Sequence, residues 1–223
     1  MSEKIIEGLY LVASSTFSWP GDCECYFVKT GENVGVLIDA GADPEAKGII
    51  KSLEELGFVP THLILTHAHI DHIGGAHALK KKYGCRVVAH ELDREPIENY
   101  DPVRTAADLY RIKYTPVKVD EIVKEDEVVL NLAGKEFTIH YIPGHTPGSI
   151  AVSLTLKGKK VLFAQDIHGP FHKNWGSDTL LWREAVEKLI QLKADILCEG
   201  HFGVFQPKEK ARQYLEGFLQ RMA

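Results

Sequence analysis

Short apolar runs recur along the chain, and most of them end in glycine, proline or charged residues. Such runs, rich in valine, isoleucine and leucine and bounded by turn residues, predict buried β-strands. They fall at residues 8–13, 25–38, 61–65, 86–89, 137–142, 150–156, 161–163 and 194–198, with further short strands between 117 and 142. Strands are therefore predicted in both halves of the chain.

Between these runs, apolar residues recur at intervals of three and four positions, the spacing of one face of a helix. The pattern predicts helices over residues 44–56, 71–83, 178–192 and 208–222, with helical pieces around 103–112. Gly57 and Gly84 follow two of these segments, as expected where a helix ends. Strand clusters flanked by helices in each half indicate an α/β protein.

The composition is that of an ordinary globular protein, with 44% hydrophobic and 26% charged residues. At 223 residues the chain has room for a substantial core and fits a single domain. The net charge of −5 argues against a nucleic-acid partner, which prefers a basic face. The basic runs at 80–82 and 157–160 are expected to be solvated. No apolar run approaches the roughly 20 residues of a membrane span, so we expect no membrane partner.

The first residues, Met-Ser-Glu-Lys-Ile-Ile-Glu, lack the pattern of a signal peptide, and we therefore expect a cytoplasmic protein. The cysteines are then expected to be reduced. Cys23 and Cys25 form a C-x-C pair, and no second pair completes a zinc ribbon. We expect these two in a strand, and Cys198 in the core rather than at a metal.

One segment carries the densest candidate chemistry. Residues 66–72 read Thr-His-Ala-His-Ile-Asp-His, so that four metal-binding groups fall within six positions. Imidazole and carboxylate together suit zinc, iron or manganese. The spacing by two turns His67 and His69 the same way along an extended segment, and Asp71 and His72 lie at the predicted helix start. The alternative, a solvated histidine-rich loop, is disfavoured by this density of ligands.

Other predicted strands end in the same kind of residue. His145 lies in the turn after the strand at 137–142, Asp166 follows the strand at 161–163, and His201 follows the strand at 194–198. Ligands at strand ends are how an α/β scaffold holds a rigid site. The sequence therefore predicts one metal site assembled from distant parts of the chain.

These motifs occur in the order found in the metallo-β-lactamase fold superfamily. The chain resembles its dinuclear hydrolases, glyoxalase II among them, from Leu37 to His201, through the H-x-H-x-D-H motif, the G-H-T-P-G-S turn, Asp166 and His201. The resemblance implies an α/β fold, the four-layer αβ/βα sandwich, with two β-sheets packed face to face and helices outside. It also implies a single domain over residues 1–223.

The resemblance further implies two divalent metal ions, zinc first, with iron or manganese as alternatives. One metal would be bound by His67, His69 and His145. The second would be bound by Asp71, His72 and His201, with Asp166 bridging the two. Asp39, in an early D-A-G turn, matches a position that supports the site.

A site of this kind predicts a hydrolase. A metal-bridging hydroxide would attack a small ester, thioester or lactone, and Asp71 could act catalytically by shuttling a proton. Ser149 is interpreted as a turn or capping residue, because no arrangement marks it as an activated nucleophile. The expected partner is a small-molecule substrate, and a homodimer stays open.

Alternative functions differ in the residues around the metals. Glyoxalase II matches every metal position, but residues 202–223 leave little room for its glutathione-binding C-terminal segment. A mononuclear-iron persulfide dioxygenase is the main alternative, although its usual motif is replaced here by 167–176. A phosphodiesterase or nuclease, and a non-catalytic binding module, are weaker alternatives. The substrate, the metals and their occupancy, the oligomeric state, and the roles of His168 and of loop 169–176 stay open.

Six histidines are left without a predicted metal: His62, His77, His90, His140, His168 and His172. Each is expected to be structural or exposed, with His168 the one that could approach substrate or hydrogen-bond a ligand. Residues 16–20, residues 169–176 and the stretch with Tyr100, Arg104 and Tyr110 could form pocket walls.

Overall fold

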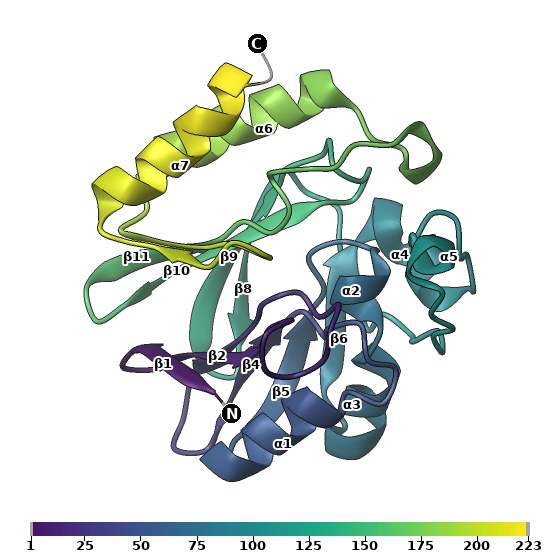
Figure 1. Ribbon diagram of the computed structural model, residues 1–223. Helices are drawn as coiled ribbons and strands as arrows, with labels where there is room; N and C mark the ends of the chain where they lie inside the picture. Colours follow the sequence, from purple (N-terminus) through teal and green to yellow (C-terminus); the bar gives the residue numbers. More distant parts are fainter. Residues whose placement is uncertain (1, 222–223) are drawn as a thin grey trace.

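Two β-sheets packed face to face form the centre of the molecule, and helices cover their outer faces (Figure 1). The computed structural model describes residues 2–221. The first sheet has seven strands in the order β1-β2-β3-β4-β5-β6-β7, and the second has six in the order β13-β12-β11-β10-β9-β8. The predicted four-layer αβ/βα sandwich is confirmed.

The strands of the first sheet are β1 (Glu3–Ile6), β2 (Leu9–Ala13), β3 (Cys25–Lys29), β4 (Val34–Ile38), β5 (Val59–Ile64), β6 (Arg86–His90) and β7 (Glu121–Val123). Those of the second are β8 (Glu127–Leu132), β9 (Lys135–Tyr141), β10 (Ile150–Leu156), β11 (Lys159–Phe163), β12 (Ile196–Cys198) and β13 (Val204–Phe205). The helices are α1 (Lys47–Leu56), α2 (Ile70–Ile73), α3 (Ala76–Tyr83), α4 (Glu91–Glu98), α5 (Ala107–Tyr110), α6 (Thr179–Gln191) and α7 (Lys208–Arg221), with a 3-10 helix η1 (Lys173–Trp175).

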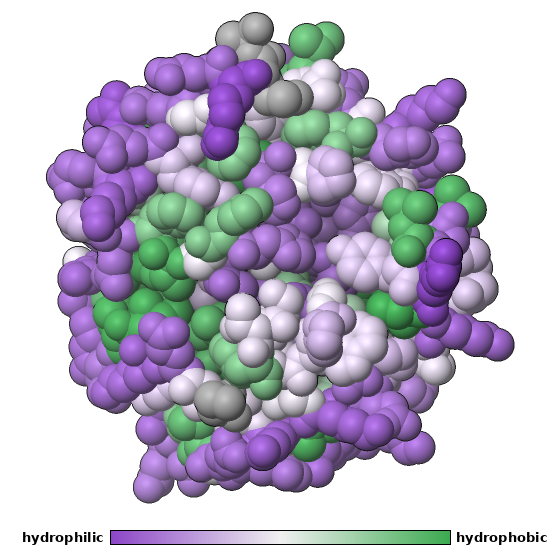
Figure 2. Space-filling model, in the orientation of Figure 1, coloured by the Kyte–Doolittle hydropathy of each residue, from purple (hydrophilic) through white to green (hydrophobic). Residues whose placement is uncertain are grey.

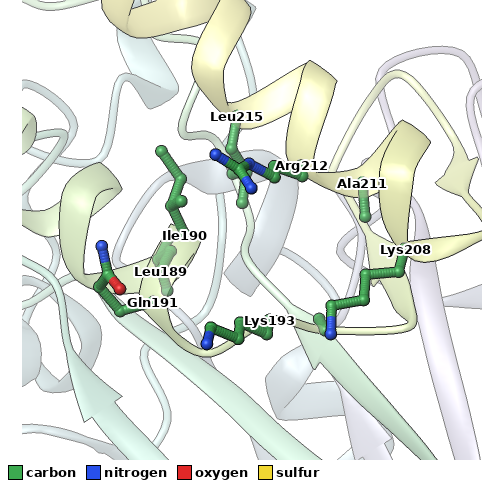
Figure 3. A pocket seen from close by; sticks show the side chains of 9 residues that line it. Leu189, Ile190, Gln191, Lys193, Lys208, Ala211, Arg212 and Leu215 are labelled. Atoms are coloured by element: carbon green, nitrogen blue, oxygen red, sulfur yellow. The ribbon is translucent and has the colours of Figure 1, made fainter.

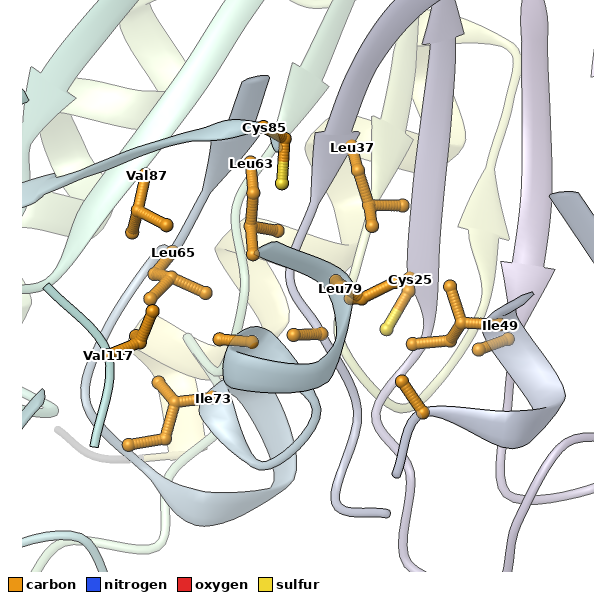
Figure 4. Close-up of a cluster of buried hydrophobic side chains, with 14 of the residues drawn as sticks. Cys25, Leu37, Ile49, Leu63, Leu65, Ile73, Leu79, Cys85, Val87 and Val117 are labelled. Atoms are coloured by element: carbon orange, nitrogen blue, oxygen red, sulfur yellow. The ribbon is translucent and has the colours of Figure 1, made fainter. Parts of the chain in front are cut away.

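Three clusters of buried apolar side chains hold the layers together. They lie between the first sheet and α1 and α3, between the two sheets, and between the second sheet and α6 and α7. Figure 4 shows the first cluster, in which Leu37, Leu63 and Val87 come from neighbouring strands and Ile49 and Leu79 from the helices. Because side chains alternate along a strand, one face of each strand enters this cluster and the other enters the layer between the sheets.

Parallel pairing places the functional loops of the first sheet at one edge. Strands β4 to β7 are parallel neighbours, and such neighbours need crossover connections, which α1 to α5 provide. The carboxyl ends of β4, β5 and β6 therefore lie at the same edge, and they lead to Asp39, to residues 65–72 and to α4. In the second sheet, the parallel pair β11 and β12 leads to Asp166 and His201.

The single helix expected over 71–83 is wrong, because the chain forms α2 and α3 there. A Cβ on Gly74 would lie 2.5 Å from the carbonyl oxygen of Ala42, and a Cβ on Gly75 would lie 2.5 Å from that of Ala40. The two glycines allow this segment to approach the loop after β4 closely. The break between α2 and α3 falls at this approach.

The remaining helices differ from expectation less. The pattern misses α4, because its segment is polar and carries Pro96 inside the helix. The predicted helix at 178–192 forms as α6, and the Asp178 carboxylate accepts hydrogen bonds from the first turn, as an N-cap does. The helix predicted over 208–222 forms as α7, while Met222 lies outside the described residues.

Helices α6 and α7 enclose a cavity of about 330 Å³ on the outer side of the second sheet (Figure 3). Its lining includes apolar Leu189 and Leu215 and basic Lys193, Lys208 and Arg212. None of its lining residues belongs to a predicted metal site. No helix within residues 2–221 is long and apolar enough to cross a membrane.

Candidate metal centre

The three histidines predicted for one metal lie together with Asp166. We call His67, His69, His145 and Asp166 the three-histidine group; one ligand atom from each lies within 4.8 Å of the others. His145 Nε2 lies 2.8 Å from His69 Nδ1, and Asp166 Oδ2 lies 3.6 Å from His145 Nε2 and 3.8 Å from His67 Nε2. All four side chains are buried.

The residues predicted for the second metal also share Asp166. We call Asp71, His72, His201 and Asp166 the mixed group, whose ligand atoms likewise lie within 4.8 Å of one another. Asp166 Oδ1 lies 3.2 Å from His72 Nε2 and 3.3 Å from His201 Nε2, and Asp71 Oδ2 lies 3.2 Å from His201 Nε2. One oxygen of Asp166 thus faces each group.

Unpartnered buried atoms show that a cation fits these groups. Nε2 of His67, Nε2 of His72 and Oδ1 of Asp166 are buried without a hydrogen-bond partner among the described residues. Each such atom costs about 1–3 kcal/mol when nothing satisfies it. A zinc ion with ligands at about 2.1 Å in tetrahedral geometry sets neighbouring ligand atoms roughly 3.4 Å apart, close to the separations found here.

The two groups differ in protonation. Burial lowers the pKa of His67 and of His69, and it lowers the pKa of His145 to about 4. Burial also opposes the charge of His201, but the carboxylates of Asp166 and Asp71 outweigh it and raise the pKa of His201 to about 10. Without a metal at neutral pH, the three histidines of the first group are neutral, and the mixed group carries a protonated histidine.

Asp39 supports the mixed group, as the family resemblance implied. His72 Nδ1 donates to Asp39 Oδ2 over 2.7 Å, and Gln165 Nε2 and Thr66 Oγ1 each donate to the same oxygen over 2.8 Å. A carboxylate on the far nitrogen fixes the ring and leaves Nε2 free to bind a metal. Asp39 also lies near His72 and Cys23 in a third cluster, but burial raises the pKa of the Cys23 thiol well above its usual range.

Glu199 was missed by the sequence analysis and holds the loop that carries His201. Its carboxylate accepts the backbone N–H of His201 over 2.7 Å and that of Phe202 over 2.9 Å. His168 Nδ1 donates to the other Glu199 oxygen over 2.6 Å. His168 therefore hydrogen-bonds a carboxylate that supports a candidate ligand, and its ring lies 5.3 Å from that of His201. The only sequence signal was an acidic residue between an apolar strand and His201.

Aromatic side chains flank the centre, as predicted for residues 169–176. The ring of Trp175 lies 4.6 Å from that of His69, and the ring of Phe171 lies 6.1 Å from that of His145. Burial and the nearby carboxylates of Asp71 and Asp166 raise the pKa of Tyr110, a residue of α5. Figure 2 shows a hydrophilic hollow near the middle of this face, beside hydrophobic side chains at the position of α5.

The remaining histidines and Ser149 contribute no ligand atom to the three-histidine group or the mixed group. The hydroxyl of Ser149 accepts the backbone N–H of Thr146 over 3.0 Å, as a turn residue does. His140 lies between Glu127 and Ser153. All four cysteines are buried and unpaired in disulfides.

A model of the metallo-beta-lactamase superfamily matches residues 18–201. The chain belongs to this superfamily. It is similar to a hydroxyacylglutathione hydrolase of Nitrobacter hamburgensis, with 38% identity over 60% of this chain and 48% of that protein. It is also similar to the hydroxyacylglutathione hydrolase GloC of Haemophilus influenzae, with 32% identity over 64% of this chain and 65% of that protein. The chain thus spans about half the length of the first relative and just under two thirds of the second.

Solved structures agree with the fold. The crystal structure of the BLEG-1 B3 metallo-beta-lactamase is 26% identical, with a TM-score of 0.75 over 90% of this chain and 95% of that chain. A motif mutant of a metallo-beta-lactamase from Cronobacter sakazakii is 22% identical, with a TM-score of 0.81 over 99% of this chain and 94% of that chain. At this identity the second similarity shows the fold alone.

Proposed function

We propose that this protein is a dinuclear metal-dependent hydrolase of a small ester, thioester or lactone. One observation carries the proposal: the Asp166 carboxylate lies between two ligand groups, with one oxygen toward each. A shared carboxylate is what two neighbouring cations need. The mixed group offers as many ligand atoms as the three-histidine group, which favours two metals over the single iron of a persulfide dioxygenase. Zinc is the proposed metal, because the donors are imidazoles and carboxylates.

Two bound divalent cations would lower the pKa of a shared water toward neutrality and polarise the substrate carbonyl. The protein supplies the rest. Burial works against ionisation of Asp71, but the charges of His72 and His201 outweigh it and lower the pKa of Asp71, so its carboxylate stays ionised and can accept a proton from an attacking water. The phenol of Tyr110, beside Asp71, can donate a hydrogen bond to a developing oxyanion. Trp175 and Phe171 shield the three-histidine group from bulk water.

A thioester is the first candidate substrate. Two similar proteins are hydroxyacylglutathione hydrolases, whose name specifies a glutathione thioester. The chain covers only part of their length, so the acyl group and the thiol are left to experiment.

Purified protein loaded with zinc, manganese or iron should be assayed against esters, thioesters, lactones and phosphodiesters. We expect turnover of one of the first three classes with two equivalents of metal, and none after chelation. Oxygen consumption on glutathione persulfide with one iron per chain would support the dioxygenase instead. Full folding without turnover of any substrate under any metal would count against an enzyme.

We also propose that residues 1–223 form one domain and that the protein is cytoplasmic. A homodimer is the oligomeric state to test. Size-exclusion chromatography with light scattering measures the oligomeric state directly.

A further inference from the structure

A buried carboxylate outside both ligand groups contacts the two segments that carry the three histidines. Asp93 lies in the first turn of α4, and its side chain is buried. It contacts no candidate ligand side chain. Yet it receives hydrogen bonds from the loop after β5 and from the turn before β10, which are far apart in the sequence.

Three donors converge on this carboxylate. Oδ2 of Asp93 accepts the backbone N–H of Ala68 over 2.8 Å and the hydroxyl of Thr146 over 2.6 Å, and Oδ1 accepts the backbone N–H of Gly148 over 2.7 Å. Ala68 stands between His67 and His69 in the chain, and Thr146 follows His145. The three donors thus flank all three histidines of the three-histidine group.

The directions of these hydrogen bonds follow from the chemistry of the donors. An ionised carboxylate can only accept hydrogen bonds, so the Thr146 hydroxyl donates its hydrogen bond to Asp93. The Ser149 hydroxyl, 2.8 Å from Thr146 Oγ1, then donates to Thr146 and accepts the Thr146 N–H. Every donor and acceptor in this cluster has a partner, which makes the geometry specific.

Gly148 allows the turn to close on Asp93. A Cβ at this position would lie 2.5 Å from the backbone nitrogen of Asp93 and 2.7 Å from its Cβ and Cγ, much closer than real contacts allow. The glycine of the G-H-T-P-G-S turn is therefore required by this approach. The mixed group has no such link to Asp93; its supports are Asp39 and Glu199.

We propose that Asp93 is a positioning residue that joins the two ligand segments and sets the three histidines relative to one another before a metal binds. This inference rests on the proposed metal centre. It predicts a selective effect, because Asp93 supports one ligand group and not the other. Loss of the carboxylate should weaken metal binding at the three-histidine group by about 10–100-fold, the usual cost of removing a group that orients ligands.

Cobalt(II) titration followed by visible absorption tests the proposal without an activity assay. In a His201→Ala background, which removes a ligand from the mixed group only, the remaining site reports the three-histidine group. There we compare Asp93→Asn, in which an amide N–H₂ faces N–H donors, with Asp93 intact. The matched control is Glu98→Gln on the same helix, whose carboxylate bonds Val119 and Arg94 instead.

A milder pair covers the case in which Asp93→Asn does not fold by circular dichroism. Thr146→Val removes one donor with little change of shape, and Thr146→Ser restores it. The proposal expects weaker cobalt binding and altered d–d bands for Thr146→Val, with recovery in Thr146→Ser.

The outcomes separate the two levels of the argument. If the unaltered protein binds no metal, the proposed function fails. If it binds two and the Asp93 or Thr146 variants bind cobalt at the three-histidine group with unchanged affinity and spectrum, only the role of Asp93 is overturned. An equal loss at the mixed group, measured in a His67→Ala background, would also overturn it by showing a general structural effect.

Discussion

The three-histidine group and the mixed group share Asp166, but they differ in burial, in charge and in the residues that support them. The histidines of the first are buried and neutral, because burial lowers the pKa of their imidazoles. The second carries two carboxylates, and the side chain of His201 is 26% exposed. Without a metal, the protonated His201 of the mixed group lies 3.2 Å from the carboxylate of Asp71 and 3.3 Å from that of Asp166, whereas the histidines of the first group are all neutral.

Because of this difference in protonation, protons compete with a metal ion for the ligand atoms of one group more than for those of the other. Ligands must be deprotonated before they coordinate, so protons compete for the mixed group at neutral pH but hardly for the three-histidine group. The residues that support the two groups also differ. The Asp39 carboxylate orients His72 through its far ring nitrogen, and hydrogen bonds to Asp93 hold the segments that carry the three histidines. Four changes to the protein or its conditions, ordered from the largest expected effect to the smallest, test whether the two groups differ in this way.

Asp166→Asn should have the largest effect, because it removes the charge common to both groups. We expect loss of the second metal and a fall in kcat/KM of roughly 1000-fold or more, about 4 kcal/mol of transition-state stabilisation. Metal content by mass spectrometry and steady-state kinetics check it. Asp126→Asn, at an exposed turn, is the control and should change neither quantity. Two metals and full turnover in Asp166→Asn would contradict the shared role.

Removing one ligand from one group should separate the two sites. His201→Ala is expected to reduce bound metal from two equivalents to one, because the three-histidine group is left intact. His67→Ala should also lose one equivalent, but from the other group. His77→Ala, a histidine of α3 outside both groups, should retain two. If both ligand variants lost all metal, the groups would not bind independently.

Metal uptake should release protons from one group only. With a pKa of about 10, His201 carries a proton at pH 7 and must lose it to bind, while His145, at about 4, has none to lose. Affinity at the mixed group should therefore rise with pH, by about tenfold per unit for each proton displaced, until the pH nears 10. Calorimetry in two buffers of different ionisation enthalpy measures the protons. Equal release for both equivalents would show that the groups do not differ.

Asp39→Asn should have the smallest effect of the four. It keeps the shape of the side chain and removes the charge beside His72 Nδ1, so we expect about 10–100-fold weaker binding at the mixed group. The three-histidine group should keep its affinity. Competition with a chelator of known affinity measures both steps, and a loss confined to the three-histidine group would be the wrong outcome for this account.

The strands were predicted better than the helices, for a physical reason. The apolar residues of a run such as Ile150–Leu156 are enough to predict a buried strand, and this run forms β10 with those bounds. The division between α2 and α3 depends on a close approach to Ala40 and Ala42, which local periodicity does not contain. Helix α4 was not predicted, because its residues are mostly polar and Pro96 lies inside it, so that its short buried face gives no apolar pattern.

The candidate ligands and Asp39 could be predicted from the H-x-H-x-D-H motif and the family resemblance, whereas the supports Asp93 and Glu199 could not. All seven predicted side chains lie in the two groups. Asp93 and Glu199 stand alone in the sequence, and the partners of Asp93 are Ala68, 25 positions away, and Thr146 and Gly148, more than 50 positions away. Partners so far apart in the sequence become neighbours only when the two sheets pack against each other.

Anomalous diffraction at the zinc edge, from a crystal of the zinc-loaded protein, would show directly whether two metals flank Asp166. The account predicts two peaks roughly 3.5–4 Å apart, one on each side of the Asp166 carboxylate, the first among His67, His69 and His145 and the second among Asp71, His72 and His201. A single peak, or two peaks that do not flank Asp166, would contradict it.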